Sequence, residues 1–84
     1  MGKDFYLIDR EALSAVGLEG AFLLSVLKES QDLEWFSMTS EEIEKKTGFS
    51  YHKQKKAINR LVDNGYIETK LAGIPAKTYY KVNN

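Results

Sequence analysis

Cysteine is absent from this 84-residue chain, which excludes a disulfide framework, a thiolate nucleophile and a cysteine-based zinc site. Long apolar runs are absent as well, because the longest, around residues 21–27, falls far short of the roughly 20 residues that span a bilayer. The sequence also opens without a signal-peptide pattern. We therefore expect a cytoplasmic protein that has no membrane partner.

Motifs that carry chemistry are few. His52 is the single histidine and stands beside lysines that would repel a cation, so the sequence does not favour a metal site. Glu41, Glu42 and Glu44 form an acidic cluster, but helix capping and the helix dipole explain it without acid–base catalysis. A serine–histidine–aspartate set, a phosphate-cradling glycine loop and a nucleotide motif are missing. We expect a protein that is not an enzyme and uses no metal or small-molecule cofactor.

What the chain does have is enough apolar material for one core. Hydrophobic residues make up 43% of the sequence, which is too much for a disordered chain. A length of 84 residues allows one modest core and leaves no room for a second. We therefore predict a single domain over residues 1–84.

Charge is divided unevenly along the chain, although the net charge is zero. Residues 1–44 contain three basic and ten acidic side chains, a net of −7, whereas residues 45–62 contain six basic and no acidic ones, a net of +6. Residues 63–84 contain three basic and two acidic side chains, a net of +1. A charge run is usually a solvated helix face, but this one lacks the glutamates at spacing four that such a helix carries. The basic segment is therefore the best candidate for contact with nucleic acid.

The first half of the chain predicts a strand, an interrupted helix and a second strand. Residues 5–8 are strand formers, and residues 10–16 favour a short helical turn that Gly17 ends. Residues 34–38 predict a short strand that includes Trp35. The main core helix is expected between them, over residues 18–32, with these apolar residues at helical spacing: Leu18, Ala21, Phe22, Leu24, Val26 and Leu27.

Two helices joined by a short glycine-containing turn are predicted next. Thr39 and Glu42 form a capping box, which starts a helix that ends at Gly48. Ser50 is a second N-cap, and its helix runs to about residue 64. The expected apolar face of this second helix consists of Ala57, Ile58, Leu61 and Val62.

A β-hairpin is predicted over residues 66–82, because strand formers flank the breaker segment 72–76 on both sides and leave a loop of about five residues. The two helices over about 39–65 form a helix-turn-helix, and the hairpin that follows is its wing. The predicted fold class is therefore α+β. We expect a winged helix-turn-helix with a three-helix core, a C-terminal β-hairpin wing and a short N-terminal strand.

Three short runs carry a resemblance to a known family. Residues 47–50 (TGFS), residues 56–58 (KAI) with Leu61, and residues 64–67 (NGYI) resemble the signature of winged helix-turn-helix domains that bind DNA in bacteria and phages. The opening of the chain is similar to the N-terminal domains of phage and plasmid replication initiators and replisome-organiser proteins. The chain departs from the pattern at Glu44, where a small apolar residue is usual, and at Gln54, where the family has Val or Ile. The resemblance implies sequence-specific binding of double-stranded DNA, in replication initiation or transcription regulation.

The helix over about 50–64 would enter the major groove of DNA in such a domain. The side of this helix that faces away from its apolar residues would meet the base edges. Side chains at the borders of that side would contact phosphates. The wing would contact phosphates or a minor groove. Lys70 and Lys77 could contact DNA from the wing, but it is equally consistent with the sequence that they are strand lysines exposed to solvent. The candidates for base contacts are Tyr51, His52, Lys55, Lys56 and Asn59, and those better placed for phosphates are Lys53, Arg60 and Ser40. The full set of candidate DNA-binding residues is Ser40, Ser50, Tyr51, His52, Lys53, Lys55, Lys56, Asn59, Arg60, Lys70 and Lys77.

A protein-interaction module is the alternative function, because the same scaffold also binds protein partners. The acidic first half of the chain and Trp35 would serve it. A single neutral domain of this size offers few phosphate contacts, so tight binding would favour two copies. A homodimer would place two recognition helices on a repeated DNA site. The salt dependence of binding distinguishes the two functions. The affinity for DNA, which depends on lysines, should fall steeply as salt rises, whereas the affinity of an aromatic protein interface should not.

Overall fold

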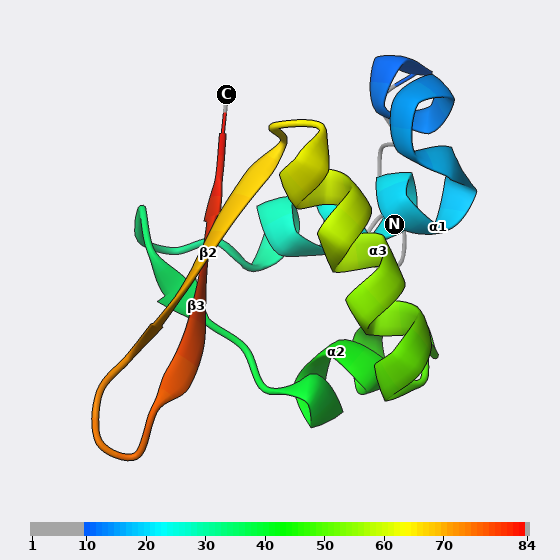
Figure 1. Cartoon of the computed structure of the whole chain (residues 1–84). Helices are drawn as coiled ribbons and strands as arrows, with labels where there is room; N and C mark the ends of the chain where they lie inside the picture. The colour runs from blue at the N-terminus through cyan, green and yellow to red at the C-terminus, as the bar shows by residue number, and fades with distance from the viewer. Residues whose placement is uncertain (1–9, 84) are drawn as a thin grey trace.

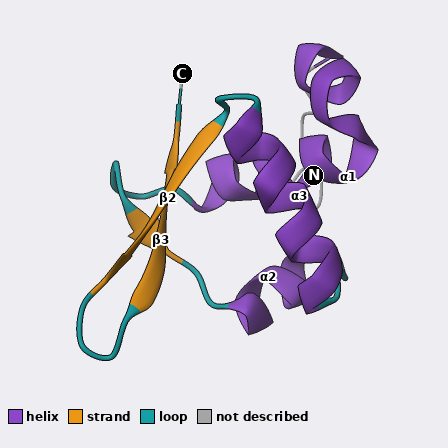
Figure 2. Ribbon diagram, viewed as in Figure 1, coloured by secondary structure: helices purple, strands orange, loops and turns teal. Residues whose placement is uncertain are grey.

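Three helices and three short strands make up residues 10–83, the part of the chain that the computed structural model describes. The helices gather on one side of the antiparallel sheet (Figures 1 and 2). The chain is thus a small α+β domain, as predicted, and its layout is compatible with a winged helix. The predicted strand over residues 5–8 lies outside the described residues. In chain order the elements are α1 (Arg10–Ser30), β1 (Phe36–Ser37), α2 (Ser40–Thr47), α3 (Tyr51–Asp63), β2 (Ile67–Ala72) and β3 (Lys77–Val82).

Gly17 bends α1 where the sequence predicts the break. Its φ of 80° and ψ of 174° are not helical, so a short first segment is set off from the main core helix. The prediction that Leu18 belongs to the core is wrong, because its side chain is 65% exposed. At 100° per residue, Leu18 lies across the helix axis from the buried residues Gly20, Leu24 and Leu27.

Local signals at the ends of α2 confirm the predicted boundaries. The Glu42 amide donates to Thr39 Oγ1 at 3.0 Å, and the Thr39 amide donates to Glu42 Oε1 at 2.8 Å, which completes the capping box. The helix ends at Gly48, whose left-handed φ of 78° lets its amide donate to the Glu44 carbonyl at 2.7 Å. Ser50 then caps α3 by accepting from the Lys53 amide.

The buried face of α3 differs from the predicted one by a single helical turn. Ala57 and Leu61 are buried and Ile58 packs against the core, as expected. Val62 was expected beside them and is 38% exposed, whereas Gln54 is only 2% exposed. Positions 54, 57, 58 and 61 follow the i, i+3, i+4, i+7 spacing of one helix face, so the buried stripe simply begins one turn earlier.

Gln54 joins α2 to α3 through a closed set of hydrogen bonds. Its amide nitrogen Nε2 donates to the Ser40 carbonyl at 3.1 Å and to the Phe49 carbonyl at 2.9 Å. Its oxygen Oε1 accepts from Ser40 Oγ at 3.1 Å. A buried amide is costly unless it is satisfied, and this one bonds at both ends. We refer to these contacts as the Gln54 clasp; they place a polar group where the resembled family has Val or Ile.

The sheet has the order β1–β3–β2, with β2 and β3 forming a hairpin. Alternation along the strands turns Phe36, Ile67, Tyr80 and Val82 into the core. The strand predicted over residues 34–38 and the predicted hairpin are both present, but β1 covers two residues instead of 34–38, and residues 73–76 connect β2 to β3 instead of 72–76. Within residues 10–83, no helix is long and apolar enough to cross a membrane.

Candidate nucleic-acid interface

The side chains of α3 that leave the core point in distinct directions. His52, Lys56 and Asn59 are exposed on the side of the helix farthest from its buried stripe. Tyr51 and Lys55 turn toward the β2–β3 hairpin and line a hollow there together with Asn59. These five are the residues that the sequence predicts for base contacts, and the structure brings all of them to accessible positions.

The hollow between α3 and the hairpin, named here the α3–hairpin groove, has a volume of about 740 Å³. Leu71 and Lys77 line it from the hairpin, opposite Lys55. Glu42 is the single acidic residue among its lining residues, and its carboxylate already accepts from the Thr39 amide. The groove is therefore basic, and it is partly open to solvent rather than an enclosed pocket for a small molecule.

Two tyrosines face the groove in different states of burial. Tyr80 is 5% exposed and packs against Phe36, with ring centroids 6.1 Å apart, whereas Tyr51 is 62% exposed. Burial raises the pKa of the Tyr80 phenol above its usual value, and the neighbouring Tyr51 raises that pKa further. Tyr80 is therefore a protonated phenol at neutral pH. The Lys55 ammonium lies 5.5 Å from the centre of the Tyr51 ring, which places a cation over an exposed aromatic face.

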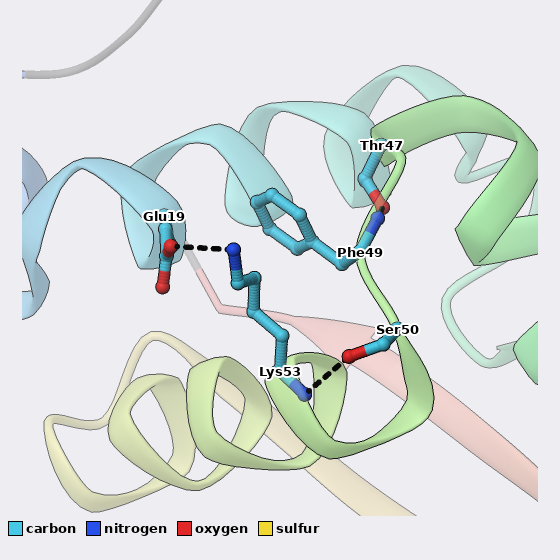
Figure 3. A network of polar contacts seen from close by, with 5 residues as sticks. All are labelled: Glu19, Thr47, Phe49, Ser50 and Lys53. Carbon is cyan, nitrogen blue, oxygen red and sulfur yellow. Dashed lines mark hydrogen bonds and ion pairs between the residues drawn. The ribbon is translucent and has the colours of Figure 1, made fainter.

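Lys53 turns to the other side of α3, toward α1 (Figure 3). Its Nζ lies 3.2 Å from Glu19 Oε2 and 5.6 Å from the centre of the Phe49 ring. The side chains of Lys53 and Glu19 are 47% and 56% exposed, so the ion pair is solvated. Lys53 is a candidate phosphate contact whose charge is shared with a neighbouring carboxylate.

Arg60 also turns toward α1 and contacts its break. The guanidinium Nη1 donates to the Val16 carbonyl at 3.3 Å, and a Cβ placed on Gly17 would meet the same nitrogen at 3.1 Å. The residue after Val16 is not helical, so this carbonyl lies at an interruption of the α1 hydrogen-bond ladder. Arg60 therefore holds the two segments of α1 against α3, in addition to its predicted phosphate contact.

Ser40 and Ser50 have structural contacts of their own. The Ser40 hydroxyl donates to Gln54 Oε1 within the clasp. The Ser50 hydroxyl oxygen accepts from the Lys53 amide at 3.4 Å. Both residues lie at helix N-termini, where backbone amides favour an anion, so the DNA contacts predicted at Ser40 and Ser50 would fall to the amides rather than to the hydroxyl hydrogens.

The two hairpin lysines lie in different surroundings. Lys70 places its ammonium 4.2 Å from the centre of the Trp35 ring, a cation–π contact across the sheet. Lys77 is exposed at the start of β3, next to the connecting turn. Lys77 is therefore free to move toward a ligand in the α3–hairpin groove, whereas Lys70 would have to leave Trp35 to do so.

Two residues that shape this surface escaped the sequence prediction. Glu19 reaches Lys53 from an element 34 positions earlier in the chain, as the numbering shows, and no local pattern signals it. Leu71 lies at the groove because of the alternation of β2, which was a usable signal. Within the described part of the chain, no three acidic or histidine side chains gather where they would hold a metal ion.

Comparison of the chain with protein-family models, with curated proteins and with solved structures gave no match. The geometry and charge of the surface described above are therefore the basis for assigning a function.

Proposed function

We propose that this protein binds double-stranded DNA as a winged helix-turn-helix domain, in replication initiation or transcription regulation. In this proposal α3 is the recognition helix and enters the major groove, while the β2–β3 hairpin is the wing. The observation that carries the proposal is the exposed basic surface of α3 beside the open α3–hairpin groove. Lys55 lies on one wall of this groove and Lys77 on the other.

The dimensions of α3 suit the major groove of DNA. With side chains, an α-helix is about 10–12 Å across, and the major groove is about 12 Å wide. An amide and two ammonium groups stand on the exposed side of the helix, on Asn59, Lys55 and Lys56. Asn pairs with the N6 and N7 groups of adenine, and Lys with the acceptors of guanine. These are side chains that distinguish base pairs as well as attract phosphates.

The α3–hairpin groove suits the sugar–phosphate strand that borders the major groove. A strand lying there passes between Lys55 and Lys77 and meets the exposed phenol of Tyr51. The N-terminus of α2 opens beside it, because Thr39 and Ser40 also line the groove. Helix N-termini attract anions through their free amides and their dipole. The charge, the shape and the hydrogen-bond donors of the groove therefore all favour a sugar–phosphate strand as its ligand.

Binding of labelled duplex DNA, followed by fluorescence anisotropy at several salt concentrations, tests the proposal. We expect the logarithm of the association constant to fall linearly with the logarithm of salt, by about 0.9 per phosphate contacted. Selection from a random duplex library is expected to enrich one sequence, and a repeated half-site within it would indicate two bound copies. Absence of binding at low salt would contradict the proposal and favour a protein partner.

Glu19→Gln is expected to increase DNA affinity by roughly two- to fivefold at low salt, because it frees Lys53 from a solvated ion pair and removes a negative charge near the bound phosphates. Anisotropy titrations measure the change. The matched control is Glu29→Gln, which removes the same charge from an exposed site at the far end of α1. Equal gains from both variants would show a general charge effect and would contradict a role for Lys53 in binding.

A further inference from the structure

The tip of the hairpin carries two large apolar side chains in water. Ile74, in the turn between β2 and β3, is fully exposed, and Leu71 on β2 is 72% exposed. Single exposed apolar residues are common on proteins, but these two are only three positions apart in the chain, at the turn end of the hairpin. In Figure 1 this turn and the start of α3 lie at the same end of the molecule. A ligand that covers α3 and fills the α3–hairpin groove therefore reaches the tip as well.

Charge around the tip favours a polyanion. Lys70 and Lys77 lie on the two strands near the tip, and Lys77 directly follows the turn. Residues 69–80 contain no acidic residue. The third lysine of the hairpin, Lys81, lies near the other end of β3 and pairs with Glu34 and Glu68, so it adds little charge at the tip. The α3–hairpin groove, which Leu71 helps to line, leads from the tip to Lys55. The apolar tip is thus set within a basic surface.

The size of the apolar tip also bears on its partner. A stable protein interface needs about 20–30 residues on each side, and its apolar contacts lie in the centre of that area. Here the exposed apolar pair stands at the end of a narrow hairpin. A wedge between two DNA bases needs only one or two side chains, because it enters a gap between flat apolar faces.

We propose that Ile74, supported by Leu71, is an apolar wedge that enters the minor groove beside the major groove occupied by α3, partly unstacks one base step and bends the duplex. This inference depends on the proposed DNA-binding function and adds a deformation to it. Side chains such as Ile and Leu act in this way in proteins that kink DNA, typically by 20–90° toward the major groove. Flexible pyrimidine–purine steps are then favoured at the contacted position, although no side chain reads those base edges.

Energy transfer between dyes at the two ends of a duplex measures the bend. The probe is the duplex selected from the random library, and anisotropy on the same samples reports binding. For the wild-type chain we expect energy transfer to rise on saturation. Ile74→Ser is expected to bind roughly three- to tenfold more weakly and, at saturation, to lose most of the rise. Leu18→Ser, another exposed apolar residue at 65% exposure but on α1, is the matched control and is expected to behave as wild type.

A second readout places the wedge at a base step. An adenine analogue that fluoresces when unstacked is placed at successive positions of the selected duplex, and one position is expected to brighten with the wild-type chain but not with Ile74→Ser. Binding without a change in energy transfer, or an unchanged bend in Ile74→Ser, would overturn the wedge and leave DNA binding intact. A failure of the wild-type chain to bind any duplex would instead overturn the proposed function, and the wedge with it.

Discussion

Replacing Lys55 and Lys56 together by alanine is expected to lower the affinity for the selected duplex by roughly 10- to 100-fold without unfolding the protein. A lysine that contacts a base edge contributes about 1–3 kcal/mol, and one that contacts a phosphate changes the salt dependence by about one unit of slope. Both side chains are exposed, so the expected change in folding stability is within about 0.5 kcal/mol. Anisotropy across a salt series measures affinity and slope, and circular dichroism checks the fold.

A control variant that loses the same number of positive charges distinguishes the loss of direct DNA contacts from the loss of net charge. Lys45→Ala with Lys46→Ala removes two exposed lysines from the last turn of α2 instead of from α3. We expect this pair to lose much less affinity and to retain the enriched sequence. If the two double variants lose equal affinity, the protein binds DNA only through its overall charge. If the Lys55 and Lys56 variant binds like the wild type, α3 is not the recognition helix.

Gln54→Leu is expected to destabilise the fold by about 1–3 kcal/mol, because it keeps the volume of the side chain but removes the Gln54 clasp. The Ser40 hydroxyl loses its acceptor, and the carbonyls of Ser40 and Phe49 lose a donor, all at the joint between α2 and α3. For a domain of this size, each kcal/mol corresponds to a fall in Tm of roughly 4–8 °C. Urea and thermal unfolding followed by circular dichroism measure the change.

The matched control for the clasp is Gln31→Leu, which changes the same residue type at a half-buried position after α1. We expect a change in stability of less than about 0.5 kcal/mol there. A Gln54→Leu variant as stable as the wild type would mean that an apolar residue serves equally well between the helices. The clasp would then have no role in holding α2 against α3.

Local signals made the boundaries of α2 and α3 predictable from the sequence, whereas the core helix, predicted to residue 32, ends at Ser30. The capping pair Thr39 and Glu42, the left-handed Gly48 and the cap Ser50 each act within a few residues, and the structure confirms all of them. The break at Gly17 was found for the same reason, since a glycine can adopt a backbone conformation that other residues avoid. Chain order and the hairpin followed from the strand formers on either side of the 73–76 turn.

Contacts between distant elements were not predictable. Which side of α1 and α3 is buried depends on what packs against them, so Leu18 and Val62 were assigned to the core and are exposed. Gln54 departs from the pattern of the resembled family, which has Val or Ile there. The sequence gives no sign that the hydrogen-bond partners that satisfy this amide include a residue on another helix. The pairing of Lys53 with Glu19 likewise joins parts of the chain that no sequence spacing connects.

Binding of duplex DNA by α3 and the β2–β3 hairpin together can be mapped residue by residue. The measurement is the amide chemical shifts of the isotope-labelled protein, recorded by NMR while duplex DNA is added. We expect large shifts along the exposed side of α3, at Tyr51, Lys55 and Asn59, and along the hairpin at Leu71 and Ile74, with small shifts in the first segment of α1. Shifts confined to α1, or to the outer face of the sheet around Trp35, would contradict it.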